Sequence, residues 1–211
     1  MRLISIFLVV IFSVGVFAEE KKISSVVNLY GVIFQYGIPP WVGKTDNPLA
    51  EFKPYRSQKG NDFILEFIPA DETFEDWNTM FAVSATRNNR TVPVNIWKDY
   101  VLSTLKSACM GYKENTLVMK GHVALAQITC PRVKGAPMKG YEGGKGEIAV
   151  FAFLIHDNVL INHYIEWRGK AFDADDQTTW PVTQEEIEKA IETLKSAKAF
   201  NDKFVVRFDT N

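Results

Sequence analysis

Apolar and polar positions alternate most clearly in the last third of the chain. Residues 148–156 (IAVFAFLIH) and 159–168 (VLINHYIEWR) are two runs of apolar, aromatic and β-branched side chains, separated by Asp157-Asn158. Such side chains suit a pleated, half-buried surface, and aspartate and asparagine both tolerate the left-handed backbone of a two-residue turn. The pattern therefore predicts a long β-hairpin in which Phe151 lies opposite Tyr164.

Because side chains alternate along a strand, this hairpin has two faces of different polarity. The first is almost entirely apolar, and we expect a helix to pack on it; its residues are Ile148, Val150, Ala152, Leu154, Ile161, His163, Ile165 and Trp167. The second, here called the polar-aromatic face, consists of Phe151, Phe153, Asn162, Tyr164, Glu166 and Arg168. Aromatic residues and arginine supply binding energy at interfaces, so this face is a candidate ligand or partner surface. The alternative is that the N-terminal strand, a long loop or a helix covers it.

A helix is predicted after the acidic loop that follows the hairpin. Thr183 and Glu186 have the spacing of a capping box, and Val182 with Ile187 fits a hydrophobic staple. Apolar residues then recur at helical spacing as far as residue 194. This stripe is the predicted partner of the apolar face.

A second long helix is predicted after Pro93, because apolar residues recur at helical spacing between residues 97 and 109. We expect Asn95 to cap this helix and Gly111 to stop it. Residues 71–80 predict a third, brief amphipathic helix, capped by Thr73 and with its aromatic residues pointing inward.

Shorter apolar runs predict further strands at residues 26–36, 63–68, 81–86, 116–120, 122–129 and 204–208. Residues 37–60 hold four prolines and predict a long irregular loop, with Trp41 covering the edge of the core. Residues 131–146 hold five glycines and predict a flexible, solvated basic loop without the P-loop pattern. Together the elements predict a single α+β domain over residues 61–211, with an antiparallel β-sheet flanked by two main helices. The N-terminal strand and the long loop precede it over residues 19–60.

The N-terminus changes the expected location of the protein. Residues 1–18 (MRLISIFLVVIFSVGVFA) combine one charge at Arg2, an apolar run and a permissive ending, so they predict a signal peptide cleaved before Glu19. We therefore expect a secreted or periplasmic protein with no stable membrane span after cleavage.

Charge and cysteine content narrow the class further. The formal net charge of −1 becomes −2 when Arg2 is removed, so nothing global favours nucleic acid as a partner. Cys109 and Cys130 are the two cysteines of an exported chain, and we expect one structural disulfide, worth roughly 3 kcal/mol on the chain-entropy model. We expect a monomer.

No catalytic or metal-binding signature stands out. His122 and His163 lie in apolar runs, where a histidine is usually a hydrogen-bonded core residue, and His156 at the hairpin turn is expected to be solvated. Their spacing is not that of a metal site, and the acidic loop at residues 173–176 lacks the glycine and distal glutamate of an EF-hand. We expect no metal and no cofactor. A hydrolase with a spatially assembled site around His163, Glu166 and Asp173 is the enzymatic alternative.

The order of elements from residue 63 onward resembles the PsbP-like fold. The resemblance covers residues 61–200 and rests on the late hairpin (GEIAVFAFLIHDNVLINHYIEW) and the final helix (EEIEKAIETLKSAKAF). It implies an antiparallel sheet flanked by helices and a non-catalytic accessory or binding role. The stretch FILEFIPADETFEDWNTMFAV is similar to a segment of uncharacterised exported proteins of Gram-negative bacteria, some from intracellular pathogens.

These observations favour an exported bacterial binding or accessory protein over an enzyme. The leader and the cysteine pair point to export, and no catalytic motif is present. The resemblance adds a secreted, virulence-associated factor acting on an unknown protein or small ligand as the expected role.

Overall fold

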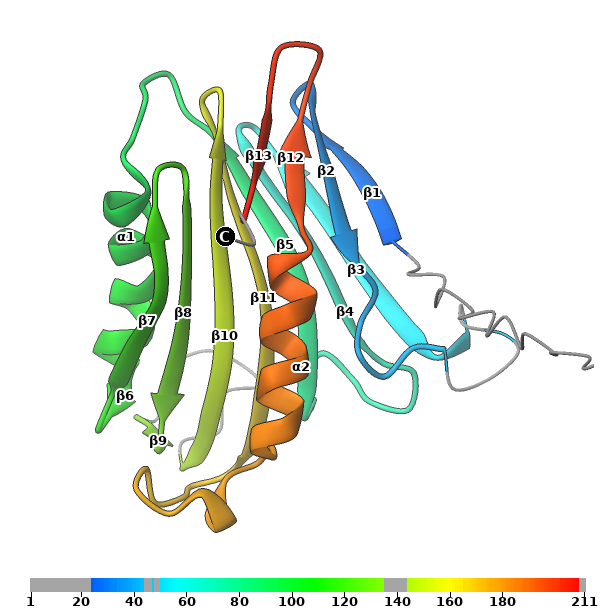
Figure 1. The fold of residues 1–211 in the computed structure, drawn as a ribbon. Helices are drawn as coiled ribbons and strands as arrows, with labels where there is room; N and C mark the ends of the chain where they lie inside the picture. Colours follow the sequence, from blue (N-terminus) through cyan, green and yellow to red (C-terminus); the bar gives the residue numbers. More distant parts are fainter. Residues whose placement is uncertain (1–23, 44–46, 48–49, 135–143, 209–211) are drawn as a thin grey trace, which may run out of the picture.

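An antiparallel sheet of seven strands forms the centre of the protein (Figure 1). The computed structural model describes residues 24–43, 47, 50–134 and 144–208. In sheet order the strands are β3 (Phe52–Lys59), β4 (Asp62–Pro69), β5 (Thr79–Arg87), β11 (Val159–Lys170), β10 (Lys145–His156), β8 (Val123–Cys130) and β7 (Lys113–Lys120). Every neighbouring pair is antiparallel. The predicted α+β class is confirmed.

The predicted hairpin is β10 and β11, and its register is confirmed. Phe151 pairs with Tyr164, and His156 pairs with Val159 across the turn. Asp157 has a φ of 44°, the left-handed conformation that the two-residue turn requires.

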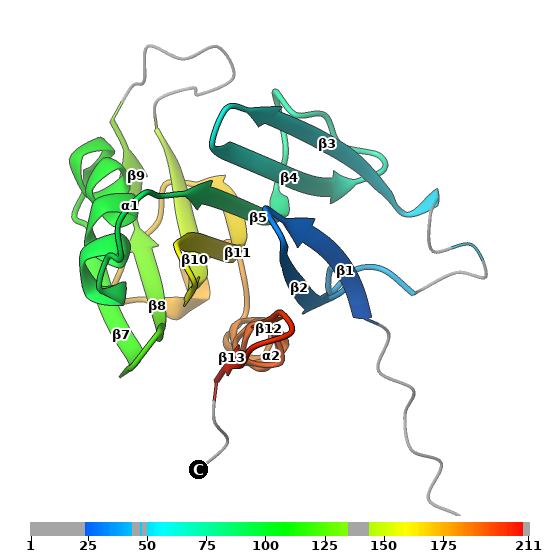
Figure 2. The same ribbon diagram turned by 90° about the horizontal axis from the view of Figure 1, so that it is seen from above.

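Helices lie on both sides of the large sheet (Figure 2). Helix α2 (Gln184–Lys195) packs on the apolar face, together with a smaller sheet in the order β1 (Ser24–Leu29), β2 (Val32–Gly37), β12 (Lys198–Phe200) and β13 (Val205–Arg207). Helix α1 (Val94–Ala108) packs on the opposite face. The protein is therefore layered, with the hairpin buried on both sides.

Helix α2 begins and docks as predicted. Thr183 accepts a hydrogen bond from the Glu186 N–H, and the Glu186 carboxylate accepts from the Thr183 N–H. Ile187 and Leu194 are fully buried in the same cluster as Ile148 of the hairpin. Burying a side chain of this size contributes about 2 kcal/mol, so packing rather than helix propensity holds the element in place.

Residues 26–36 form a hairpin rather than one strand. Tyr30 and Gly31 have φ values of 57° and 91°, so both occupy the left-handed region and form a tight turn between β1 and β2. The prediction of one interrupted strand is wrong, because Gly31 reverses the chain direction instead of merely interrupting the pairing.

The predicted long loop is shorter than expected, because β3 occupies its second half. Pro54 lies within β3, which is the edge strand of the sheet, so one of its two sides needs no ladder hydrogen bond. Trp41 packs against the main core, as predicted.

The predicted brief helix at residues 71–80 does not form. The Glu72 carboxylate accepts hydrogen bonds from the N–H and the amide of Asn78, and Thr73 accepts from the Asp76 N–H. These side-chain bonds satisfy backbone donors in a loop conformation and so compete with a helix. The aromatic residues of this segment do point inward, as expected: Trp77 is buried, and Phe74 packs beside it.

Helix α1 starts two positions earlier than an Asn95 cap would allow. Pro93 is the N-cap residue, and the Trp97 N–H donates to its carbonyl. The fixed φ of proline suits this boundary, so the prediction of an Asn95 cap is wrong.

The disulfide between Cys109 and Cys130 is present, as predicted, with its Cα atoms 5.6 Å apart. It joins the end of α1 to the end of β8. Two short strands, β6 (Cys109–Met110) and β9 (Arg132–Val133), pair beside it. A short 3-10 helix, η2 (Gln177–Thr179), lies in the acidic loop.

The signal peptide prediction and the centre of the basic loop, residues 135–143, lie outside the described residues. None of the helices in the described part is long and apolar enough to cross a membrane.

Candidate functional site

His163 lies inside the core. Its side chain is fully buried beside Phe34 and Phe81, and its Nδ1 lies 2.8 Å from the Ala82 carbonyl oxygen, to which it donates. Burial lowers the pKa of this imidazole to about 4. The prediction of a hydrogen-bonded core histidine is confirmed here. Because Nδ1 donates, Nε2 carries the lone pair, and it has no hydrogen-bond partner among the described residues.

The expectations for the other two histidines are wrong. His156 is fully buried; its ring stacks on Phe204 with centroids 4.0 Å apart, and its Nε2 donates to the Phe204 carbonyl oxygen at 3.0 Å. The C-terminal segment before β13 therefore covers a residue that was expected to be solvated. His122 is exposed, because it forms the turn between β7 and β8 with Gly121 instead of starting a core strand.

Two glutamates meet on the polar-aromatic face. Glu147 pairs with Arg168 across the hairpin, and Glu166 is the next residue toward the middle of the sheet on the same face of β11. The Arg168 Nε donates to Glu147 Oε1 at 2.9 Å, and all three residues are buried. The indole of Trp77 lies 3.7 Å from the guanidinium carbon and closes the outer side of this cluster. We call Glu147 and Glu166 the acidic pair.

The surroundings of Glu166 favour its protonated form. Burial is the main cause that raises the pKa of the Glu166 carboxyl well above its usual range, and the neighbouring Glu147 carboxylate raises it further. Arg168 acts in the opposite direction but does not outweigh these effects. The Arg168 guanidinium is a direct partner of Glu147, and the raised pKa favours the protonated form of Glu166.

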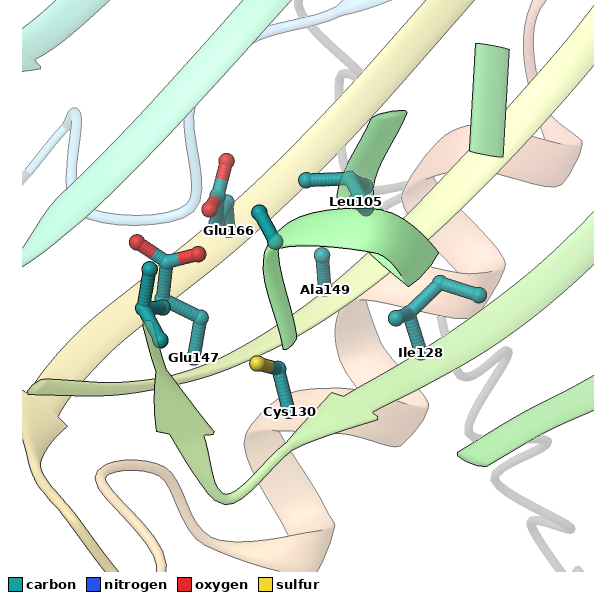
Figure 3. Close-up of a pocket in the computed structure, with 8 residues that line it drawn as sticks. Leu105, Ile128, Cys130, Glu147, Ala149 and Glu166 are labelled. Atoms are coloured by element: carbon teal, nitrogen blue, oxygen red, sulfur yellow. The ribbon is translucent and has the colours of Figure 1, made fainter. Parts of the chain in front are cut away.

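The space beside the acidic pair is small. A cavity of about 20 Å³ lies under α1, lined by Leu105, Ala108, Ile128, Cys130, Val133, Glu147, Ala149 and Glu166. Figure 3 shows the two carboxyl groups side by side, with Leu105 and Ala149 close to them. This volume holds about one water molecule. No organic substrate fits against these carboxyl groups.

Glu147 was not singled out in the sequence, although a signal was present. It lies one position before the apolar run, and continuing the alternation back from Phe151 places it on the polar-aromatic face. Its pairing with Arg168 follows from the register of the hairpin.

Five of the six residues of the polar-aromatic face are buried, and Tyr164 is half-buried. Helix α1 covers Phe151 and Phe153, and Trp77 covers Arg168. Of the two sequence interpretations, cover by a helix therefore describes most of this face, and only Tyr164 reaches the surface appreciably.

The structure does not bring His163, Glu166 and Asp173 together. His163 and Glu166 lie on opposite faces of β11, so the sheet itself separates them. Asp173 lies in the loop beyond β11, where its carboxylate accepts a hydrogen bond from the Asp175 N–H at 2.9 Å. The described residues contain no group of three or more side chains placed to hold a metal ion.

Beyond Tyr164, the same sheet face continues onto β5, β4 and β3 with less cover. Register places Ser84 and Ile64 in one cross-strand row with Asn162, and Glu66 and Tyr55 in the next row with Tyr164. We call this surface the open strip: Tyr55, Ser57, Ile64, Glu66, Ser84 and Tyr164, all exposed or half-buried. Burial raises the pKa of the Glu66 carboxyl.

Comparison with known proteins adds no family to this description. A scan against protein-family models gives no match to the chain, and a search of curated proteins finds none that is similar.

Proposed function

We propose that this chain is an exported, non-catalytic binding or accessory protein of a Gram-negative bacterium, secreted or periplasmic. The observation that carries the proposal is the enclosure of the acidic pair. The raised pKa of the Glu166 carboxyl is of the kind found in acid–base catalysis, but the cavity of about 20 Å³ beside it lies under α1 and admits no substrate. The N-terminal leader and the cysteine pair support export.

The open strip is the proposed place of contact with a partner. It is where the polar-aromatic face reaches the surface, at the half-buried Tyr164, and it adds the exposed Tyr55. At its inner end, the Asn162 Oδ1 is buried and accepts no hydrogen bond from a described residue. A buried acceptor without a donor costs free energy, and a donor from a partner would recover it. A secreted virulence-associated role is a further part of the proposal and rests on the resemblance alone.

A hydrolysis screen tests the non-catalytic part. The purified protein is incubated with chromogenic esters, glycosides and peptides, beside a Glu147→Gln/Glu166→Gln variant. We expect no hydrolysis above that of the variant with any substrate, because neither carboxyl group can reach a scissile bond. Turnover that disappears in the double variant, while circular dichroism shows that the variant is folded, would contradict the proposal.

A further inference from the structure

A cleft of ligand size lies at the end of the sheet where β8 ends and β10 begins. Its volume is about 450 Å³, and it is lined by Met110, Pro131, Arg132, Ala171, Phe172, Asp173 and Thr179. Small-molecule sites in proteins are typically about 300–1,000 Å³. In Figure 1 the β6–β9 pair and the loop after β11 both lie at this lower end of the molecule.

The disulfide holds one wall of the cleft. Met110 directly follows Cys109, and Pro131-Arg132 directly follow Cys130, so the cross-link fixes both segments at their roots. Met110 pairs with Arg132 in the β6–β9 ladder. Met110 is 52% exposed, which is unusual for a methionine in a tied-down segment and leaves its thioether available for contact.

The loop after β11 forms the opposite wall and is fixed as firmly. The Phe172 N–H donates to the Pro131 carbonyl at 3.1 Å, which ties the two walls together at the base. Gly146 allows this approach, because a Cβ there would lie 2.5 Å from the Phe172 ring. The Asp173 carbonyl accepts the indole N–H of Trp180 at 3.1 Å. The cleft is thus preformed.

The charges of the cleft lie on opposite walls. Arg132 comes from the disulfide wall and Asp173 from the loop wall, and neither forms an ion pair with a described residue. The apolar groups of Met110, Pro131 and Phe172 line the same cleft. A guanidinium binds a carboxylate through paired hydrogen bonds, and a carboxylate binds an ammonium group.

We propose that this cleft binds a short apolar peptide in its zwitterionic form. The ligand carboxylate lies on Arg132, its ammonium group faces Asp173, and its apolar side chains pack on Met110 and Phe172. The inference rests on the proposed binding role of the protein, but not on the open strip.

Isothermal titration calorimetry with the dipeptide leucyl-phenylalanine tests the proposal. Arg132→Gln should weaken binding of the dipeptide about tenfold or more and leave binding of its C-terminal amide unchanged. Asp173→Asn should weaken binding of the dipeptide to a similar extent and leave binding of its N-acetyl derivative unchanged. The matched controls Arg90→Gln and Asp202→Asn, both exposed at the far end of the molecule, should change the affinity less than about twofold.

Saturable binding with this charge dependence supports the proposal. The absence of saturable heat up to about 10 mM dipeptide, an affinity too weak to be specific, overturns it. The proposal is also overturned if the unmodified protein binds the two charge-blocked derivatives as tightly as it binds the dipeptide. Neither result bears on the proposal that the protein is non-catalytic. That proposal is contradicted by hydrolysis in the substrate screen.

Discussion

Glu166 connects one buried proton to the stability of the whole protein. The pKa of its carboxyl is higher in the folded protein than in the unfolded chain, so the folded protein binds this proton more tightly. The stabilising contribution of the protonated form is complete below the ordinary glutamate pKa of 4.5 and declines as the pH rises above it. At neutral and alkaline pH, burial of Glu166 lowers the free energy of unfolding, and its hydrogen bond to Glu147 offsets only part of this loss.

Glu166→Gln should remove this destabilisation, because glutamine is neutral at every pH and still donates a hydrogen bond to Glu147. We expect the variant to be more stable than the unmodified protein by about 1–3 kcal/mol at pH 8 and nearly equal to it at pH 4.5. Urea denaturation at four pH values measures the difference. The exposed control Glu75→Gln should leave the pH profile unchanged. Parallel profiles for the unmodified protein and Glu166→Gln would refute the assignment of the proton.

His163 should make the opposite contribution at acid pH. Its folded pKa of about 4 lies below its ordinary value of 6.5, so the neutral imidazole stabilises the fold above pH 6.5, and this contribution is lost as the pH falls through 4. The loss amounts to about 3 kcal/mol.

His163→Asn keeps a donor near the Nδ1 position but cannot be protonated. We expect it to be less stable than the unmodified protein at neutral pH, because the ring volume is lost, yet to lack the decline between pH 6.5 and pH 4. Thermal or urea denaturation across this range measures the slope. His122→Asn, in the exposed turn, serves as control and should retain the full decline. An unchanged slope in His163→Asn would show that another group causes it.

At the scale of elements, prediction succeeded where the determinants are local. The β10–β11 hairpin, its register and the capping box of α2 each depend on residues within a few positions of one another. The Cys109–Cys130 bond followed from composition, since a chain with two cysteines has one intramolecular pairing available.

Elements set by distant contacts were missed. Strand β3 carries Pro54 and many charged residues, and it is a strand only because β4 offers an unpaired edge. Residues 71–80 have helical spacing, but their side chains satisfy the backbone in a loop that Trp77 anchors over Arg168. Alternation could locate Glu147 beside Arg168, whereas the closure of the site by α1 depends on tertiary packing.

At the scale of the whole molecule, export is the prediction with the broadest consequence. A fusion of residues 1–30 to alkaline phosphatase, which is active only outside the cytoplasm, should give an active enzyme, and the mature protein should begin at Glu19. Replacing Leu8 and Val9 by arginine interrupts the apolar run and should abolish the activity. An active fusion after that change, or a purified protein that retains residues 1–18, would contradict the predicted leader.

The position of the hairpin in the sheet also sets the order in which the protein can fold. Strands β10 and β11 lie between β3–β5 on one side and β7–β8 on the other, and both helices pack on them. The two flanking groups are made first during synthesis, but they cannot join into one sheet until residues 145–170 exist. Because nonlocal pairing must wait for its central strands, the chain stays without its core until most of it has been synthesised. If the predicted leader directs the chain to a membrane pore, this late folding suits passage in the unfolded state.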